Sequence, residues 1–393
     1  MTSRAPFALS GIKFFSYSRQ PLLETWTCSM LVQKMIFRLP ELLLQCGRTL
    51  REVEVGYETY GTLNEKGDNA ILVAHYFSGT SHAAGRYNEN EPEPGYWDAI
   101  IGPGKAIDTN KFFVISSDTL SNINAKVPTV TSTGPSSIDP ETGRYYGSTF
   151  PIVTIGDFVT VQKALADALG IKHFHAVCGP SMGALQAFEW AVRYPDMIDR
   201  VMPVIGPGIA TEPYLISLVS LWAAPIALDP NFNGGDYYGQ IEPLRGLKEA
   251  FKTITLTCVG YDWALRLYQR RLGDKGPDPA IDLAGKFAID QSLDDLAKVR
   301  ASTSDANALL RTARAVQLFS IHERKQRLKA RFLFIAASSD QVMQKAYSDR
   351  GIKEIRDLGL TVEEFVIEGD GGHLDGLNKI GQAAETIRKF MNT

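Results

Sequence analysis

The sequence predicts an α/β fold in which a mostly parallel, twisted sheet is flanked by helices and interrupted by a helical insertion. Along most of the chain, short apolar runs of strand length alternate with stretches of helical periodicity. The chain has 393 residues, more than one small domain needs. A core with one insertion explains that length more simply than two independent folds.

Most elements of the core can be assigned from these patterns. Alternating Val53, Val55 and Tyr57 indicate a half-buried strand, and the later apolar runs indicate buried strands. A loop rich in Ser, Thr, Pro and Gly covers 118–151, and loops of such length are more often functional than inert. The remaining expected elements are strands at 70–74, 112–116, 173–178, 201–205, 331–337 and 362–367, and an amphipathic helix at 154–169.

The insertion is expected at 208–325, as a helical lid over the carboxyl edge of a core formed by 36–207 and 326–393. Its clearest helical segments are 215–224, 244–254, 263–271 and 306–321. Four aromatic residues in it could line a pocket, form a dimer contact or be ordinary core: Trp222, Tyr237, Tyr238 and Trp263. Residues 1–35 form an extension of unknown role, too broken by polar residues for a signal peptide or a membrane span.

The segment Gly179-Pro180-Ser181-Met182-Gly183 is the most informative motif in the chain. It places G-x-S-x-G directly between an expected strand and a helix-forming stretch. The two glycines allow a sharp turn, which holds the serine hydroxyl clear of both elements. Ser181 is therefore a candidate nucleophile, whereas the plainer interpretation is a Gly-rich turn.

A serine hydroxyl needs a histidine to take its proton and an acid to orient that histidine. Asp340 follows the expected strand at 331–337, and His373 lies in a Gly-rich loop after the strand at 362–367. The carboxyl ends of parallel strands meet at one edge of a sheet, so these groups can gather there. The order Ser181, Asp340, His373 is the one that α/β-hydrolases use.

Other residues compete for these roles. His173 and His175 lie at the start of the elbow strand and are expected to pack or face solvent, and His322 lies in a basic helical stretch. Asp370 is nearer to His373 in sequence, but a spacing of three within one loop orients the ring poorly. Asp340 is preferred.

Backbone N–H groups for a tetrahedral oxyanion are expected from Met182, which follows the serine, and from Phe77, in the loop after the strand at 70–74. His75 and His82 flank that loop, but no cysteine or carboxylate stands at metal-binding spacing from them. We expect neither a metal site nor a cofactor.

Composition points to a small-molecule partner. The chain has 41 basic and 44 acidic residues, so it has no large field that would favour a nucleic acid or a membrane surface. The four cysteines form no C-x-x-C pair, which favours a reducing, cytoplasmic location: Cys28, Cys46, Cys178 and Cys258.

Several motifs, in order, resemble the homoserine O-acetyltransferase family of α/β-hydrolases, and the resemblance covers nearly everything after Phe37. It implies Ser181, Asp340 and His373 as the triad, Phe77 and Met182 as oxyanion donors, a helical lid and a homodimer joined through lid helices. The motifs are YETYGTLN at 57–64, WD at 97–98, IGPGK at 101–105, STGPSS at 132–137, DP at 229–230 and GGDY at 234–237.

Three positions depart from the family pattern. The resemblance implies an Arg and a Tyr that hold the amino-acid substrate, but Phe251 and Cys258 stand in their places. The family also follows its catalytic histidine with Asp, where this chain has Leu374.

A pocket lined by these residues, without a charged anchor, favours small neutral esters and water as the acceptor. We therefore expect a serine carboxylesterase for short-chain esters, with homoserine O-acetyltransferase as the alternative. A silent binding protein of the same fold is disfavoured by the complete triad order.

Overall fold

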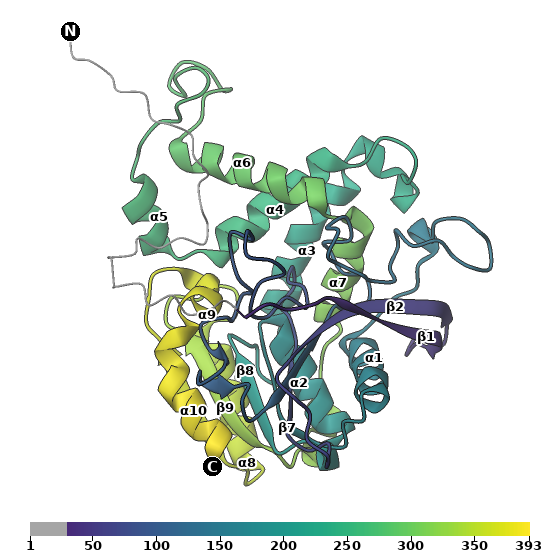
Figure 1. Ribbon diagram of the computed structural model, residues 1–393. Helices are drawn as coiled ribbons and strands as arrows, with labels where there is room; N and C mark the ends of the chain where they lie inside the picture. The colour runs from purple at the N-terminus through teal and green to yellow at the C-terminus, as the bar shows by residue number, and fades with distance from the viewer. Residues whose placement is uncertain (1–29) are drawn as a thin grey trace.

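The computed structural model describes residues 30–393, which form the predicted α/β fold (Figure 1). The main sheet has eight strands in the order β1-β2-β6-β3-β7-β8-β9-β10. β2 pairs antiparallel with β1 and β6, and the other neighbours are parallel. The strands are β1 (Met35–Leu43), β2 (Thr49–Tyr60), β3 (Ala70–Val73), β6 (Phe113–Ser117), β7 (Phe174–Pro180), β8 (Arg200–Val204), β9 (Arg331–Ala337) and β10 (Val362–Ile367); β4 (Ile101–Gly102) and β5 (Ile107–Asp108) form a separate pair.

Both faces of the sheet are buried, as the apolar runs predict. In β3, Ala70 and Leu72 join the hydrophobic cluster beneath α1, α2 and α8, whereas Ile71 and Val73 join the cluster beneath α10. The covering helices are α1 (Ile155–Ala168), α2 (Met182–Arg193), α8 (Lys345–Asp357), α9 (Asp375–Asn378) and α10 (Ala384–Asn392). Short 3-10 turns are η1 (Gly147–Thr149), η2 (Pro195–Met197), η3 (Pro230–Gly235), η4 (His322–Arg327), η5 (Gly372–Leu374) and η6 (Ile380–Ala383). Within residues 30–393, no helix has the length and apolar character needed to cross a membrane.

The helix expected at 154–169 begins where its sequence predicts. The Thr154 side chain accepts from the Asp157 N–H, and the Asp157 carboxylate accepts from the Thr154 N–H, which together form a capping box. Local chemistry therefore fixes the start of α1.

Five helices lie between β8 and β9, in the segment expected to form the lid. They gather above one edge of the sheet in Figure 1, and α4 packs between α3 and α6. α6 was not predicted, because its buried face consists of Ser292, Leu293, Ala297 and Ala301, which give little apolar periodicity. The five are α3 (Pro213–Ala227), α4 (Leu244–Cys258), α5 (Tyr261–Tyr268), α6 (Ala288–Thr303) and α7 (Ala306–Gln317).

The end of the expected N-terminal extension packs against the core. β1 begins at Met35, and before it the Val32 N–H already donates to the Arg86 carbonyl. β1 was not predicted, and its Pro40 fits only because β1 is the edge strand, where a missing N–H is tolerated. The Lys34 ammonium lies 3.2 Å from the Asp118 carboxylate. The predicted boundary at 35/36 therefore falls inside a structured segment.

Candidate active site

Ser181 occupies a strained turn between β7 and α2. Its backbone has φ 55° and ψ −116°, which places a non-glycine residue in the left-handed half of conformational space. A Cβ at Gly179 or Gly183 would collide with the Ala74 carbonyl oxygen, so both positions need glycine. The G-x-S-x-G pattern thus reflects the close approach of three chain segments.

The structure brings Ser181, His373 and Asp340 into one hydrogen-bonded chain. The Ser181 Oγ lies 2.8 Å from the His373 Nε2, and the His373 Nδ1 lies 2.7 Å from the Asp340 Oδ2. The other carboxylate oxygen accepts from the N–H groups of Val342 and Met343, at 2.8 and 2.9 Å. Asp340 is therefore held in place by the backbone while its second oxygen orients the ring. We call these three residues the Ser181 site.

The competing residues have other partners. Asp370 pairs with Arg266 at 2.7 Å, and no hydrogen bond joins it to His373 in the described part of the chain. His173 contacts the Asp199 carboxylate, His175 contacts the Met391 carbonyl, and His322 lies 3.7 Å from Glu354 at the surface. None of the three histidines contacts Ser181.

The two expected oxyanion donors lie beside the serine's own segment. Met182 is the first residue of α2, where helical N–H groups lack an intrahelical acceptor. Phe77 follows β3, and its loop is tied to α2 because the Gln186 side chain donates to the His75 carbonyl at 3.2 Å. The loop that carries Phe77 and the first turns of α2 are therefore held against each other.

His75 is a structural residue of that loop. Its Nε2 accepts from the Thr119 N–H at 3.1 Å, and its Nδ1 lies 2.7 Å from the Tyr76 carbonyl. Burial lowers the pKa of His75 to about 4, so the ring is neutral at pH 7. It anchors the loop that carries Phe77.

The residues at the three departing positions lie in or beside the lid. Phe251 is fully buried in α4, Cys258 ends that helix, and Leu374 follows His373 in η5. Burial raises the pKa of the Cys258 thiol to about 12, and the charge of Asp340 adds to the effect. Cys258 is therefore a neutral thiol within the electrostatic range of the Ser181 site.

A charged side chain that the sequence analysis did not anticipate lies against one of these residues. The Arg300 guanidinium, from α6, lies over the Phe251 ring with its carbon 4.4 Å from the ring centre. A signal was present in the sequence, since Arg300 stands about two helical turns beyond Leu293 and one beyond Ala297, on the buried side of α6. It was missed because α6 itself was missed.

The aromatic residues of the insertion have definite places. Trp222 is buried, packs on the Phe77 ring at 5.7 Å, and donates to the Thr257 hydroxyl in α4. Tyr237 and Tyr238 both donate to the Asp305 carboxylate, so they hold η3 against α7. Trp263 packs edge-on against Tyr268 within α5. Of these four residues, Trp222 therefore joins the inserted helices to the loop that carries Phe77.

The described cysteines are reduced. Cys46, Cys178 and Cys258 are all free thiols, and burial raises the pKa of Cys178. Cys28 lies outside the described residues.

Comparison with known proteins agrees with this fold. A family model described as the alpha/beta hydrolase fold matches residues 131–379. The homoserine O-acetyltransferase of Methanohalobium evestigatum is 37% identical over 92% of this chain and 73% of its own length. The crystal structure of esterase E22 gives a TM-score of 0.88 at 41% identity, covering 92% of this chain and all of the other. The crystal structure of homoserine O-acetyltransferase from Bacillus anthracis gives a TM-score of 0.88 at 35% sequence identity, covering 93% of this chain and 98% of the other.

Fold and relatives together define an enzyme of the hydrolase or acyltransferase type. The chain belongs to the α/β-hydrolase family and, within it, to the group of homoserine O-acetyltransferases and their esterase relatives. The resemblance inferred from the sequence motifs is thereby confirmed.

Proposed function

We propose that this protein is a serine carboxylesterase that hydrolyses short-chain esters through an acyl-enzyme. The observation that carries the proposal is the hydrogen-bonded chain from Ser181 through His373 to Asp340. A base within hydrogen-bond distance of a serine with a strained backbone, and oriented by a carboxylate, is the arrangement that nucleophilic acyl transfer needs.

In the first half-reaction, the Ser181 Oγ bonds to the ester carbonyl carbon while its proton passes to the His373 Nε2. The carbonyl oxygen gains negative charge, which the N–H groups of Phe77 and Met182 stabilise. The bond to the alcohol oxygen then breaks, and the leaving alcohol takes the proton from His373. In the second half, His373 removes a proton from water, the hydroxide attacks the acyl carbon, and Ser181 leaves as a hydroxyl.

The residues at the three positions that differ from the family pattern favour water over homoserine as the acceptor. Phe251 and Cys258 replace the Arg and Tyr that the family resemblance assigns to amino-acid binding, and Leu374 replaces an Asp. A carboxylate that loses its guanidinium partner loses an interaction worth about 1.5–3 kcal/mol. The 41% identity to esterase E22 supports the same choice. Homoserine O-acetyltransferase remains the alternative, supported by the names of the sequence relatives.

One experiment separates the two reactions. The purified protein is incubated with short p-nitrophenyl esters and, separately, with acetyl-CoA and homoserine. We expect saturable hydrolysis of the acetate and propionate esters and little release of free CoA that depends on homoserine. Efficient, saturable acetylation of homoserine would reverse the assignment.

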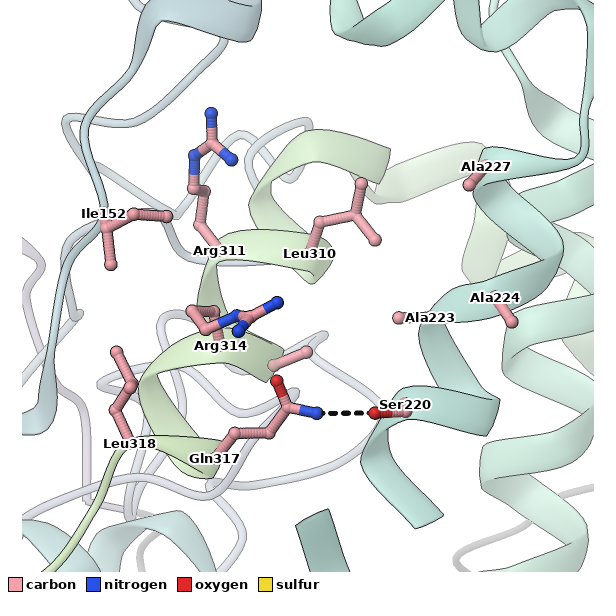
Figure 2. Close-up of a pocket in the computed structure, with 11 residues that line it drawn as sticks. Ile152, Ser220, Ala223, Ala224, Ala227, Leu310, Arg311, Arg314, Gln317 and Leu318 are labelled. Carbon is pink, nitrogen blue, oxygen red and sulfur yellow. Dashed lines mark hydrogen bonds between the residues drawn. The ribbon is translucent and has the colours of Figure 1, made fainter. Parts of the chain in front are cut away.

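We also propose that the insertion at 208–325 acts as the lid and that two copies of the chain associate through it, in a cytoplasmic setting. A groove of about 580 Å³ lies between α3 and α7, with Ser220, Ala223 and Ala224 on one side and Leu310 and Gln317 on the other (Figure 2). Neighbouring side chains of α3 are apolar yet exposed, with Leu221 at 62% and Tyr214 at 61%. Light scattering of the protein and of a Leu221→Glu variant tests the association of two copies. A monomeric parent would contradict it.

A further inference from the structure

Arg300 is a cation without an anionic partner. Among residues 30–393, its guanidinium makes no ion pair and no hydrogen bond, whereas other partly buried arginines such as Arg324 pair with carboxylates. Its recorded contact is the face of the Phe251 ring, at 4.4 Å. Such a stack uses the flat face of the guanidinium and leaves its N–H edge for an acceptor.

Partial burial makes an unpaired guanidinium unfavourable at this position. Loss of solvent lowers the pKa of Arg300, since the buried cation is the disfavoured form. Buried charges in proteins are normally paired or hydrogen-bonded. A position near the C-terminal end of α6 gives some compensation through the helix dipole, but supplies no directed acceptor.

Three observations place Arg300 near the Ser181 site. Its partner Phe251 lies in α4, and the carbonyl of Cys258 at the end of α4 approaches Gly372, next to His373, so closely that a Cβ there would stand 2.7 Å away. The charge of Arg300 also acts on the Cys258 thiol and on the Tyr76 hydroxyl, in the loop that carries Phe77. The guanidinium is thus close to the end of α4 and to that loop.

We propose that Arg300 binds a carboxylate of the substrate, so that the preferred substrate of the Ser181 site is a short-chain ester that carries a negative charge. The inference rests on the proposed esterase function and specifies its substrate class. The guanidinium that the family resemblance places on α4 is absent, whereas Arg300 comes from α6, so a carboxylate bound to it would lie at a different place from that of homoserine. A carboxylate and a guanidinium form paired, charge-assisted hydrogen bonds, which select by geometry as well as by charge.

Matched esters test the proposal. Acetoxyacetate carries the carboxylate in its alcohol part, and 2-acetoxyacetamide is its neutral counterpart; monomethyl succinate carries the carboxylate in its acyl part, and methyl succinamate is the neutral counterpart. We expect the parent to prefer one charged ester in kcat/KM. In Arg300→Gln that charged-to-neutral ratio should fall by about 10- to 100-fold, mainly through KM, and Arg300→Lys should restore part of it. The pair that responds identifies which part of the substrate carries the carboxylate.

Lys298→Gln is the matched control, because Lys298 is an exposed cation two residues away on α6. In Lys298→Gln, the ratio of kcat/KM for the charged ester to that for the neutral ester should equal the ratio in the parent. If Arg300→Gln leaves both ratios at the parent value, the proposal is wrong even though the esterase stands. If the parent hydrolyses p-nitrophenyl acetate but prefers neither charged ester, the proposal is also wrong, whereas a parent that hydrolyses no ester at all contradicts the esterase assignment instead. Titration calorimetry then tests binding without turnover. The Ser181→Ala variant should bind a charged ester, and the double variant Ser181→Ala, Arg300→Gln should not.

Discussion

The Ser181 site and a second cluster, formed by Glu58, Ser81 and His82, both contain a serine, a histidine and a buried carboxylate, but they connect them in different orders. In the Ser181 site, the histidine lies between the serine and the acid. In the Glu58 cluster, the carboxylate lies in the middle, 3.0 Å from the Ser81 hydroxyl and 3.0 Å from the His82 Nδ1. Ser81 therefore faces a carboxylate whose pKa of about 2 makes it a far weaker base than a histidine. The same three residue types can build a reactive serine or an inert one, and connectivity decides which.

The Glu58 cluster has the features of a structural ion cluster. Burial alone would raise the pKa of Glu58, but the hydrogen bond with His82 and the charge of Lys34 outweigh it, and the pKa is about 2. Glu58 also accepts from the hydroxyls of Tyr60 at 2.8 Å and Tyr87 at 2.6 Å. It joins the segment before β1 to β2 and to the loop after β3. Its acceptors are all occupied, whereas Arg300 offers unused donors.

The largest expected effect contrasts the two serines. Ser181→Ala removes the nucleophile and should lower kcat for p-nitrophenyl acetate by about 10⁴- to 10⁶-fold, with the circular dichroism spectrum unchanged. Ser81→Ala should keep the turnover number of the parent, because the Ser81 hydroxyl bonds to Glu58 and not to a base. Activity of Ser181→Ala within a few-fold of the parent would refute the assignment.

The next effect concerns Asp340. Asp340→Asn should lower kcat by about 10³- to 10⁴-fold and leave measurable activity, since Ser181 and the oxyanion donors remain. The amide can no longer accept both from the His373 Nδ1 and from the N–H groups of Val342 and Met343. Steady-state kinetics at fixed pH measure the loss. An Asp340→Asn enzyme as active as the parent would mean that another group orients His373.

Glu58→Gln should affect stability instead of turnover. Removing one charge from a buried, paired cluster should lower the free energy of unfolding by about 3 kcal/mol at pH 7, as measured in urea. Because the folded-state pKa of Glu58 lies below its ordinary value of 4.5, the Glu58 contribution is present above pH 4.5 and is lost as the pH falls toward 2.

The difference between parent and Glu58→Gln should therefore shrink between pH 4.5 and pH 2. Burial raises the pKa of neighbouring Asp118, which acts in the opposite direction but is present in both proteins. A difference that does not change with pH would show that Glu58 is not ionised in the folded protein.

Tyr87→Phe gives the smallest effect. It removes one of several donors to Glu58, the hydroxyl at 2.6 Å, and should lower the free energy of unfolding by about 1.5 kcal/mol without changing kcat. Thermal unfolding beside the parent measures it. A loss as large as that of Glu58→Gln would mean that the cluster fails as a unit when any donor is removed.

Much of the fold was predictable because its signals are local. The apolar runs that become β3, β7, β8 and β9 lie on strands buried on both faces, where nearly every side chain must be apolar. β1 and α6 were missed because each buries only part of its surface, and the buried positions of α6 hold small or polar residues.

The sequence by itself determined the fold class, the elbow at Ser181, and the order in which Asp340 and His373 follow it. These features are local. Glycines on both sides of a serine indicate a tight turn, and polar residues at strand ends indicate a site, so each can be recognised from one segment of the sequence. The tertiary structure alone decided that Lys34 bonds to Asp118, 84 positions away, and that Arg300 stacks on Phe251. Such contacts follow from how helices and loops pack against one another, so their residues look like ordinary surface charges until the chain is folded.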